Sequence, residues 1–183
     1  MKNLINNEFK ITSILGKGYH IDSLTASLVD QFKNKNVLLF QDKNLYHSCK
    51  RLQLCFGIDL INQIDYFADE FDVLIIDKIK DYVNAHETIN LFENISQSEK
   101  LKDKQFIFIF TSKTDKYNID IKDFPNLGNA ILRYSDNIYA LRQTEHDFIK
   151  GRVYKLENIQ TQETHFLSER PNGVKIIMEE ANE

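Results

Sequence analysis

The segment Phe71-Asp72-Val73-Leu74-Ile75-Ile76-Asp77 decides the fold of this 183-residue chain. It is a short, β-branched apolar run, which predicts a strand buried on both faces in the middle of a parallel sheet. Asp77 closes the run, so its carboxylate is expected at the carboxyl end of the strand, where open α/β sheets bind ligands. An acid at this place can hold the magnesium of a bound nucleotide, and it can equally be the first residue of a polar loop.

Further apolar runs place strands and helices in alternation around this segment. The other buried strands of this part are predicted at 9–15, 37–40 and 105–110. The spacing of apolar residues predicts helices at 21–32, 45–56, 58–68 and 82–96. The glycine turn Gly16-Lys17-Gly18 separates the first strand from the first helix, for which Asp22 is the expected N-cap. This order is the usual geometry for holding a phosphate at a helix N-terminus.

The last third of the chain changes to a succession of strands. They are predicted at 137–141, 151–156 and 174–177, with a turn at 171–173 just before the last of them. We therefore expect an α/β fold whose mostly parallel central sheet is extended by antiparallel C-terminal strands. No linker or repeat divides the sequence, so residues 1–183 are expected to form a single domain.

The composition excludes several classes of function. Hydrophobic residues make up 42% and charged residues 27%, as in ordinary soluble globular chains, and no apolar run approaches the length of a membrane span. The net charge is -4, so contact with nucleic acid would need a local basic patch or a partner. Cys49 and Cys55 fit no metal or disulfide spacing, which favours a reducing, intracellular compartment. The five histidines are scattered, and no metal site is predicted.

Three parts of the sequence together resemble the ATPase core of the RecA superfamily of recombinases. The first strand with Gly16–Ser23 stands at the P-loop position, and Phe71–Asp77 resembles the Walker B strand. Residues 127–141, 151–156 and 172–174 resemble the family's C-terminal pattern of a Leu-Gly segment, a strand, a basic strand and a late glycine-aliphatic strand. The resemblance is closest to degenerate eukaryotic recombinase paralogues, such as the small subunits of Shu-type complexes. It implies a RecA-like P-loop core that lacks the N-terminal domain and the polymerisation segment of full recombinases.

The P-loop of this sequence departs from the pattern G-x-x-x-x-G-K-[ST]. Gly16 and Ser23 match the two ends of the pattern, but Ile21 and Asp22 stand where the family has Gly-Lys. An acid at the lysine position repels the β- and γ-phosphates that the lysine would attract.

Two further parts of the family's catalytic site are replaced. The resemblance places the glutamate that orients the attacking water just after the second strand, where Lys43 stands beside Asp42. The glutamine that senses the γ-phosphate falls at the end of the fourth strand, where Lys113 stands. We therefore predict no ATP hydrolysis, no tight nucleotide binding and no cofactor. The residues that would support any remaining nucleotide contact are Gly16, Gly18, Ser23 and Asp77.

The polar loop at 111–126 is a second candidate site. In RecA-type proteins the matching loop contacts single-stranded DNA, and lysines with an aromatic residue can hold phosphates and stack a base. The candidate DNA-binding residues are Lys113, Lys116, Tyr117 and Lys122. However, Asp115, Asp120 and Asp123 nearly cancel the positive charge, which favours a charge-balanced surface loop over a DNA-binding one.

The resemblance implies a non-catalytic recombinase-paralogue accessory protein of the nucleus. Such a protein heterodimerises with another paralogue and promotes or stabilises recombinase filaments on single-stranded DNA during homologous recombination repair. Two alternatives stay open. One is a degenerate replicative-helicase-like RecA core from a mobile element. The other is a Rossmann-like domain that binds a small ligand, for which Gly16-Lys17-Gly18 is a thin fingerprint.

Overall fold

A mixed β-sheet forms the centre of the computed structural model, which describes residues 3–41, 52–55, 64–79, 84–112, 119–144, 153–170 and 173–180. The described strands are β1 (Ile11–Lys17), β2 (Val37–Phe40), β3 (Leu52–Cys55), β4 (Val73–Ile76), β5 (Gln105–Ser112), β6 (Asn137–Gln143), β7 (Val153–Asn158), β8 (Thr164–Arg170) and β9 (Gly173–Glu180). Their order in the sheet is β3-β2-β4-β5-β1-β6-β7-β8-β9. Neighbours from β3 to β6 in this order are parallel, and β7, β8 and β9 continue the sheet with antiparallel pairing. The predicted fold is confirmed.

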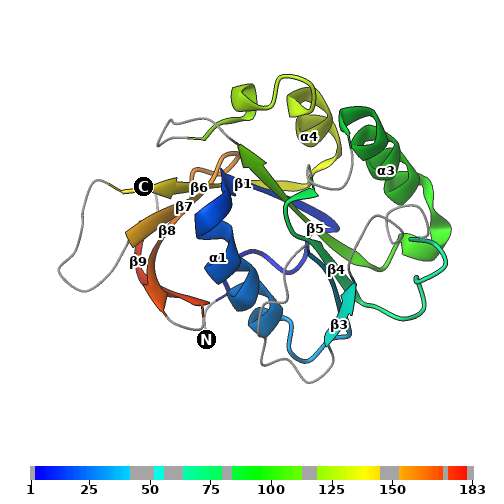
Figure 1. Cartoon of the computed structure of the whole chain (residues 1–183), viewed down its shortest axis with the longest axis horizontal. Coiled ribbons are helices and arrows are strands. Elements are labelled where there is room, and N and C mark those ends of the chain that lie inside the picture. The colour runs from blue at the N-terminus through cyan, green and yellow to red at the C-terminus, as the bar shows by residue number, and fades with distance from the viewer. Residues whose placement is uncertain are drawn as a thin grey trace.

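Helices cover both faces of the parallel part of the sheet (Figure 1). The apolar side chains of α1 (Gly18–Gln31) pack on one face, and those of α3 (Ala85–Gln97) and α4 (Gly128–Tyr134) pack on the other. Two short 3-10 turns, η2 (Glu99–Leu101) and η3 (Ile121–Asp123), complete the described helical elements. None of the helices in the described part of the chain is long and apolar enough to cross a membrane.

The strand predicted from Phe71–Asp77 is β4, which lies between β2 and β5. Leu74 and Ile76 belong to the apolar cluster under α3 and α4, whereas Val73 and Ile75 belong to the cluster under α1. Because strand side chains alternate between the two faces, a strand covered on both sides needs an unbroken apolar run. Full burial of each such side chain contributes roughly 1.5–3 kcal/mol, which makes this strand a main source of stability.

Two predicted helices are wrong where the structure describes them. Leu52–Cys55, inside the predicted helix at 45–56, is β3 and pairs in parallel with β2. Residues 64–68, at the end of the predicted helix at 58–68, form turns. The other residues of both predictions lie outside the described part of the chain. Short apolar segments carry similar spacing in a strand and in a helix, and here the pairing with β2 decides the outcome.

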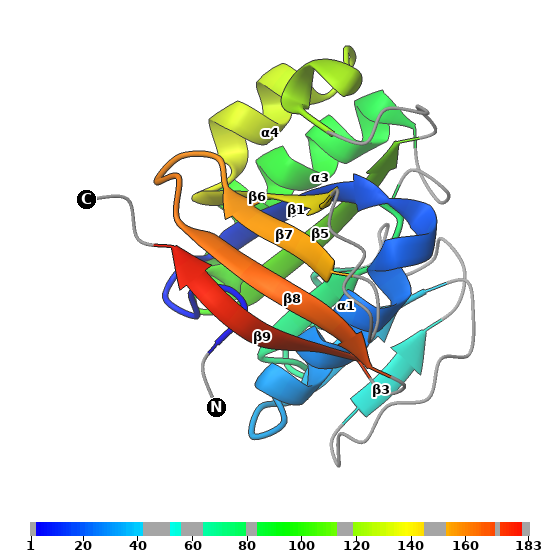
Figure 2. The same ribbon diagram turned by 90° about the vertical axis from the view of Figure 1, so that its left-hand side faces the viewer.

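The C-terminal strands β6 to β9 continue the sheet beside α1 (Figure 2). The backbone N–H of Val174 donates a hydrogen bond of 2.7 Å to Ser27 Oγ of α1. Gly173 has a φ of 140°, and a Cβ atom there would lie 2.3 Å from Ser27 Oγ. Only glycine fits this close approach, which fixes where β9 meets α1. The sequence prediction contained no strand corresponding to β8.

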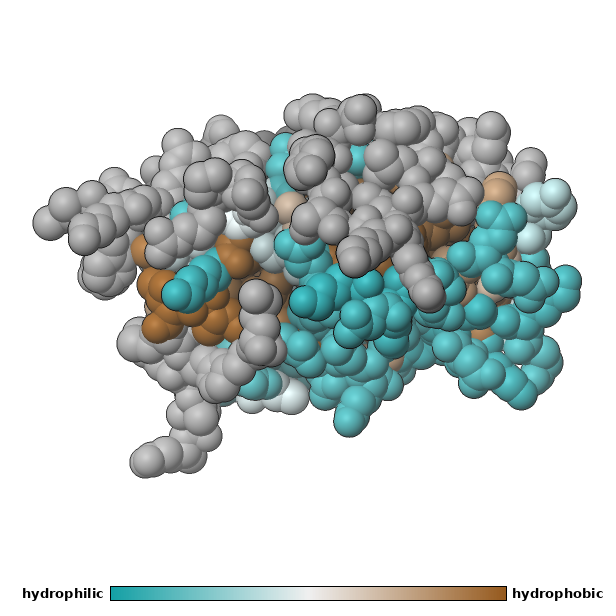
Figure 3. Space-filling view, turned by 90° about the horizontal axis from the view of Figure 1, so that it is seen from below, coloured by the Kyte–Doolittle hydropathy of each residue, from teal (hydrophilic) through white to brown (hydrophobic). Residues whose placement is uncertain are grey.

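Within the part of the chain that the structure describes, β9 forms one edge of the sheet, because it pairs there with β8 alone. On this strand the Ile177 side chain is 48% exposed. Figure 3 shows a hydrophobic area at the left of the lower face, at the side of the molecule where β9 lies in Figure 1. An edge strand with an apolar surface is a ready place for contact with another chain.

Candidate functional site

The junction of β1 and α1 has no loop between strand and helix. β1 pairs with β5 as far as Lys17, opposite Ser112, and α1 begins at the next residue, Gly18. The residues aligned with a P-loop are therefore the end of a strand and the first turns of a helix. A phosphate cradle needs a loop whose successive N–H groups converge on the ligand, and this junction does not form one.

Two expectations about this junction are corrected. Gly16 belongs to β1 and not to a turn, and it pairs with Thr111 of β5. A Cβ atom at Gly16 would lie 2.8 Å from Ile21 Cδ1, so the glycine allows α1 to pack closely on the strand. Asp22 is not the N-cap, because α1 begins four residues earlier and its N-cap is Lys17. Continued pairing of β1 with β5 keeps Gly16 and Lys17 in the strand, so the helix begins directly at Gly18.

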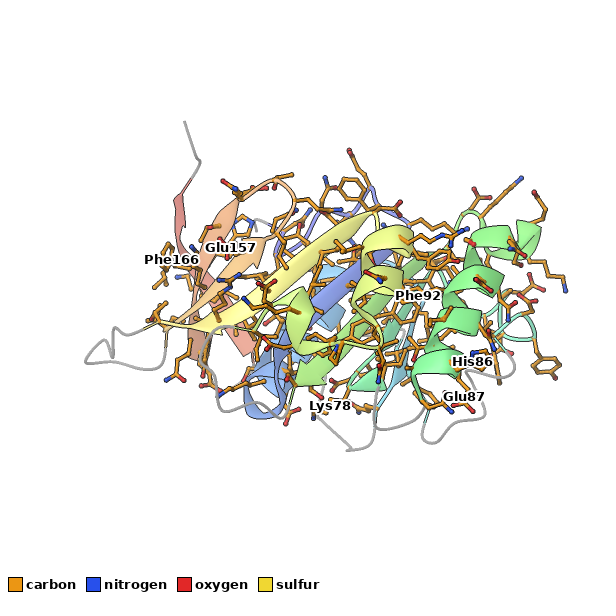
Figure 4. All side chains as sticks on the ribbon, turned by 90° about the horizontal axis from the view of Figure 1, so that it is seen from above. Lys78, His86, Glu87, Phe92, Glu157 and Phe166 are labelled. Carbon is orange, nitrogen blue, oxygen red and sulfur yellow. The ribbon has the colours of Figure 1, made fainter. Side chains whose placement is uncertain are left out.

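An ion pair joins α1 to the carboxyl end of β4. Lys78 Nζ donates to Asp22 Oδ1 at 2.6 Å, and the side chains are 8% and 31% exposed, respectively. Lys78 is labelled in Figure 4. Asp22 stands where the resemblance places the P-loop lysine, and Lys78 directly follows the Walker B-like Asp77. Compared with the pattern of the resemblance, an acid replaces the lysine on the helix, and a lysine follows the retained acid at the end of the strand. Sequence reasoning missed Lys78, although a lysine directly after the closing acid was a usable signal.

The backbone of Lys78 adopts a left-handed conformation with a φ of 54°. A non-glycine residue in this region is strained, at a cost of roughly 1–2 kcal/mol. The surrounding contacts, including the ion pair with Asp22, hold the residue in this conformation. The left-handed conformation of Lys78 is therefore stabilised by contacts of its side chain and not by the preference of its own backbone.

Asp77 lies at the carboxyl end of β4, as predicted. Its backbone N–H donates to the carbonyl oxygen of Phe40 at 2.9 Å, which extends the pairing of β2 with β4 by one residue. The residue is 1% exposed. By strand alternation its side chain faces α1, as those of Val73 and Ile75 do.

Ser23 points to another part of the molecule. Its Oγ donates to Glu169 Oε1 of β8 at 2.9 Å, and the same carboxylate accepts a hydrogen bond of 3.0 Å from the hydroxyl of Tyr154. Successive helix residues project about 100° apart, so Asp22 reaches β4 while Ser23 reaches the C-terminal strands. The hydrogen bonds thus direct Ser23 to β8, away from Asp77. Gly18, the remaining candidate for nucleotide contact, is the first residue of α1.

The candidate DNA-binding loop is described only in part. Lys113, Lys116 and Tyr117 lie outside the described residues, as do Asp42 and Lys43. Lys122 lies in η3 with its side chain 76% exposed, and its Nζ is 3.7 Å from Asp120 Oδ2. The Asp120 carboxylate also accepts a hydrogen bond from the backbone N–H of Ile121 and so caps η3. The acid near Lys122 therefore has a structural role besides balancing its charge.

A pocket of about 260 Å³ lies at the N-terminal end of α3. It is lined by Asn84, Ala85 and residues 123–127. The Asn84 side chain accepts a hydrogen bond from the backbone N–H of Glu87, and the Glu87 carboxylate accepts one from the N–H of Asn84. Figure 4 shows Glu87 and the neighbouring His86 at this end of α3. The polar side chains of the helix start are therefore used in a capping box. Among the described residues, no group of three or more His, Cys, Asp or Glu side chains gathers as a metal site.

Comparison with known proteins identifies the fold. No family model matches the sequence, and no curated protein matches it. Among solved structures, a KaiC-like protein from the hyperthermophilic archaeon Pyrococcus horikoshii is similar over 92% of this chain and 89% of that chain. The TM-score is 0.60 and the sequence identity is 9%. This likeness shows a RecA/KaiC-like α/β fold, and at such an identity it shows the fold alone.

Proposed function

We propose that this chain is a catalytically silent RecA-like protein that acts by binding, as an accessory subunit of the recombinase-paralogue type. It heterodimerises with another paralogue in the nucleus and promotes or stabilises recombinase filaments on single-stranded DNA in homologous recombination repair. The observation that carries the silent character is the ion pair between Asp22 and Lys78 at the place of the P-loop lysine.

Electrostatics at this place oppose nucleotide binding. The carboxylate of Asp22 repels phosphate oxygens, and the ammonium group of Lys78 already binds that carboxylate at 2.6 Å. A nucleotide would have to break this pair before Lys78 could serve a phosphate group. The direct passage from β1 into α1 also leaves no loop of N–H groups to replace the missing lysine.

The edge of the sheet at β9 supports the binding part of the proposal. An exposed Ile177 and an edge strand give another chain both apolar contact and backbone hydrogen-bonding groups. Contact with single-stranded DNA is assigned to the partner or to the 111–126 loop, because the net charge of -4 gives the chain no general affinity for phosphates.

A phosphate-release assay tests the silent character. The purified protein with Mg-ATP, with and without single-stranded DNA, is expected to release no more phosphate than its Asp77→Ala variant. The control Asp69→Ala removes an exposed carboxylate outside the candidate site. Magnesium-dependent turnover that Asp77→Ala abolishes and Asp69→Ala preserves would contradict the proposal.

Affinity purification from the protein's own organism, with mass spectrometry, tests the binding role. The expected result is another recombinase paralogue in a one-to-one ratio, together with the main recombinase. Size-exclusion chromatography of the recovered complex separates the alternatives, since a ring or hexamer favours the replicative-helicase-like core. Recovery of no recombinase or paralogue would overturn the recombination role while leaving the absence of hydrolysis unaffected.

A further inference from the structure

Gln41 directly follows β2 and is completely buried. Neither the nitrogen nor the oxygen of its side-chain amide has a hydrogen-bond partner within the described part of the chain. A buried amide without partners is strongly unfavourable, and native proteins seldom keep one. The amide therefore needs a partner that the described protein groups do not supply.

The direction of Gln41 follows from the alternation along β2. Leu39 belongs to the apolar cluster under α1, and Phe40 belongs to the cluster on the opposite face. Alternation places Gln41 on the α1 side. Phe40 is in register with Ile76, and the hydrogen bond from the Asp77 N–H to the Phe40 carbonyl continues the pairing. Gln41 and Asp77 therefore lie side by side, and both face α1.

Thr25 reaches the same space from the helix. It is completely buried, and its Oγ1 has no hydrogen-bond partner among the described residues. Thr25 comes three residues after Asp22, so both lie on one side of α1. The Asp22–Lys78 contact shows that this side faces the end of β4. Two buried polar groups, one on α1 and one at the end of β2, thus face the layer between α1 and the sheet.

We propose that ordered water occupies this space and bridges the amide of Gln41 to the hydroxyl of Thr25. Both groups can donate and accept, and water matches both functions at once. Phosphate or another anion is disfavoured by the carboxylates of Asp22 and Asp77. Among the described residues, no group of three or more His, Cys, Asp or Glu side chains could hold a metal ion here. The edge of the sheet where a nucleotide would bind in an active P-loop protein is then filled by an ion pair and internal solvent. This inference does not depend on the recombination role.

The direct test is NMR of the ¹⁵N-labelled full chain. The side-chain NH₂ of Gln41 is expected to show cross-relaxation with water of long residence time. Gln97, which is exposed, provides the control for rapidly exchanging surface water. Absence of a long-lived water signal at Gln41, with the resonance assigned, would overturn the proposal.

Urea unfolding of Thr25→Val and Gln41→Met provides the second measurement. If water bridges the two groups, each substitution removes a hydrogen bond and lowers the folding equilibrium constant by about 3- to 10-fold. If the groups had no partner, both apolar replacements would raise that constant instead. Thr161→Val, at an exposed position, is the control and should leave it unchanged. A rise for both buried variants contradicts the proposal, and the NMR result on the unaltered protein decides if either variant fails to fold.

Discussion

Replacement of Asp22 by Asn should destabilise the protein more than replacement of Lys78 by Met. Lys78 has only 8% of its side chain exposed, so loss of Asp22 removes a charged partner from a buried ammonium group. Loss of a partner from a buried ion pair costs about 3–5 kcal/mol. Asp22 is 31% exposed and can regain water after loss of Lys78, so a cost of about 1–2 kcal/mol is expected there.

The double variant Asp22→Asn/Lys78→Met completes a thermodynamic cycle. Because it leaves neither charge behind, it should be more stable than Asp22→Asn alone, with a coupling free energy of about 2 kcal/mol. The free energy of unfolding is measured by urea denaturation, followed by circular dichroism at constant pH. Matched controls are Asp69→Asn and Lys100→Met, which change exposed charges and should lie within about 0.5 kcal/mol of the unaltered protein.

Salt adds a second criterion to the same cycle. A pair with one member buried is screened much less than a surface pair, so the coupling should persist at about 0.5 M salt. Additive single-variant effects, or a coupling that vanishes in salt, would refute the assignment of this contact as a buried ion pair. The reading that Asp22 and Lys78 replace a nucleotide contact would then lose its basis.

Three further changes test the packing, the alkaline stability and the edge strand. Gly16→Ala should lower the free energy of unfolding in urea by about 1–3 kcal/mol, because the new Cβ would lie 2.8 Å from Ile21 Cδ1. An unchanged free energy would contradict the packing described for α1. Burial raises the pKa of Tyr139 in the folded protein. The contribution of its neutral form to stability is therefore complete below a pH of about 10, and it is lost as the pH rises through the raised pKa. Tyr139→Phe should therefore flatten the fall of the unfolding free energy above that pH, and an unchanged alkaline profile would argue against it. Ile177→Lys, at a side chain that is 48% exposed, should leave the melting temperature within about 2 °C but reduce partner recovery in affinity purification; Tyr66→Lys, at 76% exposure and away from β9, is the control.

The local sequence pattern correctly predicted those strands whose burial leaves a continuous apolar run in the sequence. The apolar run of β4 and its closing Asp77 were placed correctly, because burial on both faces leaves an unbroken run. β3 was mistaken for a helix. Its conformation is decided by pairing with β2, and the local spacing of apolar residues gives no sign of that pairing. Strand β8 escaped prediction for a similar reason: its place is fixed by antiparallel neighbours on both sides.

The candidate site was less accessible from the sequence than the fold. The acid at position 22 was recognised as a departure, but its partner Lys78 is 56 residues away and is reached only through the meeting of α1 with β4. Ser23 was assigned by its place in a motif, whereas the structure directs its hydroxyl to Glu169, 146 residues away. Such contacts depend on tertiary packing, and a motif read from neighbouring residues carries no information about them.

The ion pair also predicts how the protein responds to nucleotide. In an active P-loop protein, the nucleotide links the start of the first helix to the end of the Walker B strand, and its binding stabilises the folded state. Here Asp22 and Lys78 link the same two elements within one chain, so the linkage does not depend on a ligand concentration. A ligand at about 100 times its Kd would add about 2.7 kcal/mol, which corresponds to a rise in melting temperature of several degrees. We expect no rise in a thermal melt with millimolar Mg-ATP, and the same flat response for the Lys100→Met control. Asp22→Asn removes the carboxylate that binds Lys78, so any rise caused by an anion should be larger in this variant than in Lys100→Met. A rise of more than about 3 °C in the unaltered protein would show that the ion pair does not stand in place of a nucleotide.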